Sequence, residues 1–224
     1  MIEIKLNKEL DKEIYLDFVD LKFGGADFGE KIRKDHPDIT KENYSEYIDE
    51  YYKTKKGEIE SSGEDLKKEI DSKQKLFFAS IKNVFGFDFS DIENIGYLSI
   101  FDCNPRWPEN KTFQIFYKRS LVNRVEVVFH ELAHFAFFEY FDKNFQTVAP
   151  NYSKNNGPLW ELSEIFNVIL LNLPEFIEVT GREEELFYPA LTEKLKLAQE
   201  EWVKRIDLKD FIKKVLEMLD KQNI

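Results

Sequence analysis

The feature that most constrains the fold is a long, largely apolar segment from Val125 to Phe141 that contains two histidines and a glutamate. The pattern is helical from Leu121 onward, and uncharged residues surround the three polar ones, as in a buried helix. His130 and His134 are four residues apart, so on a helix both imidazoles project from one face, one turn apart. Glu131 directly follows the first histidine. Such polar groups in apolar surroundings cost several kcal/mol unless they are paired or bind a metal.

The spacing of the two histidines allows both to bind a single ion, and zinc is the ion typical of such a helical pair. Zinc lowers the pKa of a bound water toward about 7, and Glu131 is placed to take its proton and pass it to a leaving amine. The alternatives are two hydrogen-bonded core histidines with an exposed glutamate, or a metal site without catalytic activity. The sequence favours one Zn²⁺ ion held by His130 and His134, with Glu131 as general base.

A catalytic zinc site uses three protein ligands and a water, so a third ligand is needed. The only other histidine, His36, lies far upstream, in a predicted turn before Pro37. Downstream, an apolar segment that opens at Gly157 offers two glutamates, Glu161 and Glu164. A carboxylate from this segment is therefore the better candidate.

Helical geometry favours Glu164 over Glu161 as that ligand. Trp160 and Val168 are its neighbours at i−4 and i+4, so its carboxylate emerges among apolar groups, where it requires a cation. Glu161 shares a more solvent-exposed stripe with Asn172 and suits the first turn of a helix, where a negative charge is favourable. We predict Glu164 as the ligand, with Glu161 as the alternative.

Strand patterns are confined to the part of the chain between Ile95 and Tyr117. Two segments there, 97–101 and 112–117, are rich in β-branched and aromatic residues, and 104–108 lies between them with two prolines. These segments predict two strands of a small antiparallel sheet.

The rest of the chain predicts helices, which gives a mostly helical α+β protein. Several amphipathic helices are expected between residues 8 and 85, with a boundary at Ser61-Ser62-Gly63. We expect a helical amino-terminal subdomain at residues 1–90, and a domain at 91–224 that carries the metal site and ends in helices.

Composition excludes several kinds of partner. A net charge of −11 without a basic block disfavours nucleic acid, and no apolar run approaches the roughly 18 residues of a membrane span.

The start of the chain lacks the pattern of a secretory signal, so the mature chain is expected to begin at Met1. A single cysteine, Cys103, excludes an internal disulfide and fits a reducing compartment. We therefore expect a cytoplasmic protein.

Two segments resemble a known family. Residues 128–135 resemble the active-site helix of the zincin metallopeptidases, and the second, glutamate-bearing helix looks like that of their gluzincin branch. Residues 162–167 are similar to the leucine-asparagine-glutamate-glycine-phenylalanine-alanine segment of aminopeptidase gluzincins, which implies that Glu164 is the ligand. The resemblance also implies a peptide or protein substrate that pairs with an edge strand at 112–117. The third histidine of metzincins is absent after His134, and so is the segment that grips a free amino terminus.

The resemblance implies one more group and leaves a second class of function open. Zincin-like enzymes add a side chain that hydrogen-bonds the oxyanion, and the candidates are Tyr152, between the two ligand helices, and Tyr188, just before Pro189. A similar two-helix pattern occurs in the ImmA/IrrE group of regulatory metallopeptidases, which cleave or control repressors. The alternative function is thus a regulatory or partner-binding protein that keeps a zinc site without proteolysis.

Overall fold

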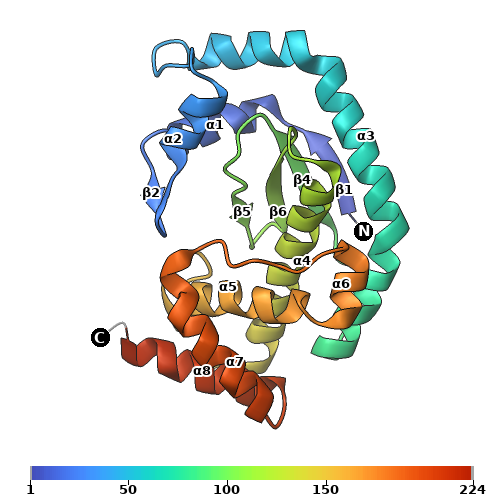
Figure 1. Cartoon of the computed structure of the whole chain (residues 1–224), viewed down its shortest axis with the longest axis vertical. Coiled ribbons are helices and arrows are strands. Elements are labelled where there is room, and N and C mark those ends of the chain that lie inside the picture. Colours follow the sequence, from blue (N-terminus) through green and yellow to red (C-terminus); the bar gives the residue numbers. More distant parts are fainter. Residues whose placement is uncertain (1, 223–224) are drawn as a thin grey trace. The chain divides into compact units, whose positions relative to one another are not determined.

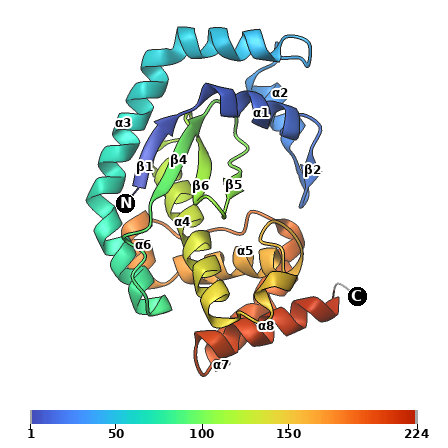
Figure 2. The same ribbon diagram turned by 180° about the vertical axis from the view of Figure 1, so that it is seen from behind.

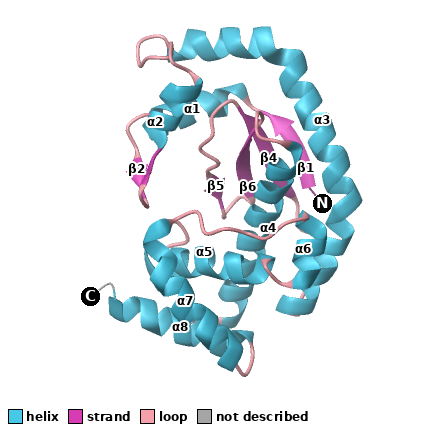
Figure 3. Cartoon of the chain, in the orientation of Figure 1, coloured by secondary structure: helices cyan, strands magenta, loops and turns pink. Residues whose placement is uncertain are grey.

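The computed structural model describes residues 2–222, which are mostly helical, with a small mixed sheet and a separate two-stranded antiparallel sheet (Figure 3). The predicted α+β class is confirmed. The helices are α1 (Lys8–Phe18), α2 (Phe28–Asp35), α3 (Tyr44–Phe85), α4 (Leu121–Asn144), α5 (Gly157–Leu171), α6 (Pro174–Thr180), α7 (Thr192–Lys204) and α8 (Leu208–Gln222), with short 3-10 helices η1 (Ala149–Asn151) and η2 (Pro189–Leu191). The strands are β1 (Ile2–Leu6), β2 (Lys22–Phe23), β3 (Ala26–Asp27), β4 (Asn94–Ser99), β5 (Arg106–Trp107) and β6 (Thr112–Phe116).

The chain forms two compact units, each built from two stretches of sequence. Unit 1 takes the described residues of Met1–Gln74 and Asp91–Phe129, and unit 2 takes those of Lys75–Ser90 and His130–Ile224. The predicted boundary at residue 90 does not match this division. Strand β1, at the start of the chain, pairs with β4, from Ile2 opposite Asn94 to Leu6 opposite Leu98, so residues on both sides of position 90 belong to one sheet.

The main sheet lies in unit 1 and has the strand order β1-β4-β6-β5 (Figures 1 and 2). The predicted antiparallel pairing of its two longer candidate strands is wrong. Strands β4 and β6 pair in parallel, from Ile95 opposite Thr112 to Ser99 opposite Phe116. The reason is β5, which lies between them in sequence, runs the other way and forms the antiparallel partner of β6.

Strand β6 is not an edge strand, so the role implied for residues 112–117 by the family resemblance is also wrong. One side of β6 pairs with β4 throughout, and on the other side β5 pairs with Thr112 and Phe113. The β6 side chains of Phe113, Gln114 and Ile115 are fully buried. The strand is therefore an interior element of the unit 1 core.

Helix α3 continues without a break through Ser61-Ser62-Gly63, so the predicted boundary there is wrong. These small residues serve close packing. A Cβ atom at Gly63 would lie 2.9 Å from the Leu98 side chain of β4, and Ser62 Oγ donates a hydrogen bond to the carbonyl of Tyr117 at 2.9 Å. The helix therefore passes close to the sheet at the positions where the sequence suggested a turn.

A buried carboxylate, Asp11 of α1, ties this helix to the sheet of unit 1. It is fully buried and accepts hydrogen bonds from four donors: Tyr52 Oη (2.7 Å), Ser99 Oγ (2.6 Å), the Ile100 amide (3.0 Å) and Gln114 Nε2 (2.9 Å). Burial raises the pKa of the Asp11 carboxyl to about 6, although these hydrogen bonds act in the opposite direction. The folded chain therefore holds a proton here at pH values where an unfolded chain has released it.

This proton predicts how the stability of the protein depends on pH. An unfolded aspartate has a pKa of about 4, so the stabilising contribution is complete below about pH 4 and is lost as the pH rises through about 6. Asp11→Asn removes the titrating group, and the hydroxyls of Tyr52 and Ser99 can turn to accept from the new amide. In urea unfolding followed by circular dichroism, we expect the wild type to lose about 3 kcal/mol relative to the variant across this window. Equal pH dependence of the two proteins would contradict the prediction.

In unit 2, Phe166 of α5 organises the core around the candidate site. Its ring centre lies 5.4–5.9 Å from those of four aromatic residues, one each from α3, α4, α7 and α8: Phe85, Phe137, Trp202 and Phe211. This packing fixes α5 against α4. It thereby places the neighbours of Phe166 in the sequence, Glu164 and Asn167, beside the histidines of α4.

Candidate metal centre

The middle of α4 presents His130 and His134 on one face, one turn apart. Seven apolar residues of the same stretch of the helix have no solvent exposure: Leu132, Ala133, Phe135, Ala136, Phe137, Phe138 and Phe141. The ring of His134 also stacks on Phe138, with ring centres 6.1 Å apart. The buried packing of this stretch therefore holds the two imidazoles in defined positions.

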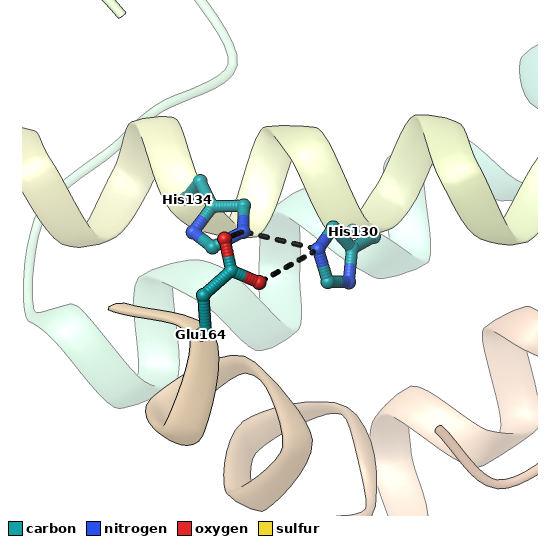
Figure 4. A group of neighbouring side chains, drawn as sticks. All are labelled: His130, His134 and Glu164. Atoms are coloured by element: carbon teal, nitrogen blue, oxygen red, sulfur yellow. Dashed lines mark hydrogen bonds and ion pairs between the residues drawn. The ribbon is translucent and has the colours of Figure 1, made fainter. Parts of the chain in front are cut away.

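Glu164 of α5 joins the two histidines in a compact group (Figure 4). The Nε2 atoms of His130 and His134 lie 3.0 Å apart. Glu164 places Oε1 3.5 Å from Nε2 of His134, and Oε2 3.8 Å from Nε2 of His130. The side chains of His134 and Glu164 are 0% and 4% exposed and that of His130 is 18% exposed, so solvent reaches the group at His130. Two imidazoles and a carboxylate arranged in this way can hold a metal ion.

The local sequence of α5 explains how Glu164 reaches the histidines. Pro158 occupies the first turn, where its missing N–H leaves no helical hydrogen bond unmade. Glu164 and Asn167 are three residues apart and share one side of the helix. On that side, Asn167 Nδ2 donates a hydrogen bond to the backbone carbonyl of His130 at 2.9 Å. The two helices that carry the candidate ligands are thus joined directly at the first histidine.

Glu161, the alternative third ligand, is paired with a different residue. Both of its carboxylate oxygens lie 2.7 Å from Nζ of Lys194 in α7, in a partly buried ion pair. This ion pair directs Glu161 toward α7, and its carboxylate lies outside the group formed by His130, His134 and Glu164. The structure therefore brings Glu164, and not Glu161, together with the histidines.

Glu184, between α6 and η2, contacts the candidate site, although its part in the site was not predicted from the sequence. Its Oε1 lies 2.9 Å from Nδ1 of His130, the ring nitrogen that does not face Glu164. Its backbone is fixed by Asn172, whose Oδ1 accepts from the Glu184 amide at 2.9 Å and whose Nδ2 donates to the Glu184 carbonyl at 3.0 Å. The sequence shows only three consecutive glutamates in a loop, which have no periodicity that would predict an inward side chain.

Three carboxylates act on the charge of His130. Burial lowers the pKa of its imidazole, but the charge and hydrogen bond of Glu184 and the charges of Glu131 and Glu164 outweigh this effect and raise the pKa to about 9. A metal ion that binds Nε2 of His130 has to displace a proton. The same negative surroundings favour a cation at this position.

Glu131, the predicted general base, is 4% exposed and directly follows His130. Its negative charge contributes to the raised pKa of His130, so its carboxylate lies within electrostatic reach of the ligand group. Consecutive residues of a helix differ by about 100° in direction. Glu131 therefore flanks the face that the two histidines share.

The two tyrosines predicted as oxyanion-binding candidates have other contacts. The Tyr152 hydroxyl donates to Asp220 of α8, and desolvation together with this hydrogen bond raises its pKa to about 12. The ring of Tyr188 packs edge-on against Trp160 at 5.0 Å, one turn before Glu164 on α5. The ring of Tyr152 packs edge-on against Phe141 of α4 at 6.2 Å, so each tyrosine lies against a helix that carries candidate ligands.

The third histidine, His36, lies in the core of unit 1. Its Nε2 is 2.7 Å from the carbonyl oxygen of Ile100, and its Nδ1 is 3.1 Å from the hydroxyl of Tyr47. Burial lowers the pKa of the imidazole. Both ring nitrogens are thus used in hydrogen bonds within the core.

Comparisons of the chain with protein-family models, curated proteins and solved structures found no match. Among the described residues, no helix has the length and apolar character needed to cross a lipid bilayer.

Proposed function

We propose that this protein is a zinc-dependent peptidase in which His130, His134 and Glu164 hold one Zn²⁺ ion and Glu131 is the general base. The observation that carries the proposal is the convergence of two imidazole nitrogens and one carboxylate from two helices in a largely buried group. The glutamate that directly follows the first histidine supplies the base. This combination resembles the gluzincin branch of the zincin metallopeptidases.

The donor atoms and their spacing fit zinc. Zinc binds imidazole nitrogen at about 2.0–2.1 Å and carboxylate oxygen at about 2.0–2.2 Å, so the ligand atoms of a tetrahedral site are about 3.3 Å apart. The separations within the group are 3.0, 3.5 and 3.8 Å, which lie on both sides of this value. Three protein ligands leave a fourth position for water or substrate, as in catalytic rather than structural zinc sites.

The residues of the chain then have distinct roles in peptide hydrolysis. Zinc, when bound, supplies a Lewis acid that polarises a carbonyl group and lowers the pKa of water. Glu131 accepts a proton from the attacking water on its carboxylate and transfers it to the nitrogen of the leaving amine. Tyr152, whose hydroxyl donates to Asp220, and Tyr188 remain the two candidates for stabilising the oxyanion. The substrate of this reaction is a peptide or a protein.

Metal analysis tests the proposal most directly. Protein purified without added zinc is expected to contain close to one zinc ion per chain, because three converging donors in a largely buried group favour the metal strongly. Chelation should abolish hydrolysis of a fluorogenic peptide library, and added zinc should restore it. A metal content well below one ion per chain that added zinc does not raise would contradict the proposal.

A further inference from the structure

The segment that leads from α6 into α7, residues 182–194, runs alongside α5 and makes three contacts with that helix and with the residue that directly follows it. The contacts are the paired hydrogen bonds between Glu184 and Asn172, the ring contact between Tyr188 and Trp160, and the ion pair between Lys194 and Glu161. This segment therefore has a fixed course along the helix that carries Glu164. A side chain that it directs toward the metal centre is held there by the fold.

Glu184 is the residue of this segment whose side chain points toward the candidate metal centre. It is 9% exposed, and its carboxylate meets Nδ1 of His130 at 2.9 Å. Its neighbours in the sequence, Glu183 and Glu185, are exposed. Only the middle one of three identical residues is therefore turned inward, which makes the contact a specific feature of the fold.

The contact determines which nitrogen of His130 can bind a metal. A carboxylate accepts hydrogen bonds, so Nδ1 of His130 is the protonated nitrogen and donates its hydrogen to Glu184. In the neutral imidazole the lone pair then lies on Nε2, which faces His134 and Glu164. A histidine ligand whose second nitrogen donates to a carboxylate is fixed in tautomer and orientation and is a more basic ligand.

We propose that Glu184 is a positioning residue of the metal centre. It holds His130 in the tautomer and orientation in which Nε2 faces the metal, and the side chain of Asn172 holds Glu184 in place. This inference rests on the proposed binding of zinc by His130, His134 and Glu164. It adds a residue from outside the two ligand helices to the machinery of the site.

Zinc affinity measured by competition with a chromophoric chelator tests this role. Glu184→Ala removes both the charge and the acceptor, and we expect zinc affinity to fall by about 10–100-fold. Glu184→Gln keeps an acceptor oxygen for Nδ1 but loses the charge, so its affinity should lie between those of the wild type and the alanine variant. Glu183→Gln and Glu185→Gln are matched controls because they remove the same charge from exposed positions, and they should bind zinc as the wild type does.

A second measurement separates positioning from a general effect on the fold. Long-range ¹H–¹⁵N correlation spectra of the zinc-loaded wild type should show His130 with its proton on Nδ1 and slow exchange of that proton. In Glu184→Ala the exchange should become fast, while the spectrum of His36, in the core of unit 1, stays unchanged. Circular dichroism of the zinc-free proteins reports whether each variant folds.

The possible results distinguish this inference from the proposed function. If the wild type binds no zinc, both the proposed function and the role of Glu184 are wrong. A wild type that binds zinc, together with Glu184→Ala and Glu184→Gln variants that match the Glu183→Gln control in affinity, overturns the role of Glu184 alone. If Glu184→Ala does not fold, the isosteric Glu184→Gln decides: reduced affinity with faster Nδ1 proton exchange supports the inference, and unchanged values overturn it.

Discussion

Glu164→Ala is expected to weaken zinc binding by orders of magnitude, beyond the roughly 10–100-fold that the loss of a partner hydrogen-bonded to a ligand costs. The Glu164 carboxylate is 4% exposed and faces Nε2 of both His130 and His134. Without it, the site retains two imidazoles and lacks the third protein ligand of a catalytic zinc centre. Zinc titration in the presence of a competing chelator measures the difference.

Glu161→Ala is the matched control, since it removes a carboxylate three positions earlier on the same helix. Its partner is Lys194, and this ion pair lies outside the ligand group. We expect the variant to bind zinc within about tenfold of the wild type. If Glu161→Ala weakened zinc binding more than Glu164→Ala, the ligand would be Glu161, and the placement of α5 would have to be revised.

The part of the site that was predictable from the sequence is the part carried by helices. The spacing of His130 and His134 fixes a shared face, and the apolar neighbours of Glu164 at i−4 and i+4 separate it from Glu161. Both arguments need only the helical repeat. The inward position of Glu184 depends instead on the course of a loop and on its hydrogen bonds with Asn172, neither of which has a periodic signal.

The fold was predictable in class but not in topology. The strand-forming segments around 97–101 and 112–117 were found because they are rich in β-branched and aromatic residues. Whether these two strands run parallel depends on β5, which lies between them in the sequence and has only two residues, too few to show a strand pattern. The helix boundary predicted at Gly63 was wrong because a glycine that permits close packing inside a helix looks the same in the sequence as a glycine that ends one.

Glu131→Gln is expected to lower the rate of peptide hydrolysis by about 10²–10⁴-fold and to leave zinc bound. The amide keeps the size of the side chain but cannot accept the proton of the attacking water. Because His130, His134 and Glu164 are unchanged, the metal content of the variant should equal that of the wild type. Measurement of kcat and of zinc per chain in the same preparation separates the loss of the base from the loss of the metal.

Glu139→Gln is the matched control for Glu131→Gln, because it makes the same substitution on α4 at a residue that pairs with Lys143 and is 26% exposed. It should retain full activity, since its carboxylate is outside the ligand group. Equal activity of Glu131→Gln and the wild type would remove Glu131 from the mechanism. A wild type that carries zinc but cleaves no peptide in the library would instead favour the alternative function, in which a zinc-bound scaffold acts through a partner.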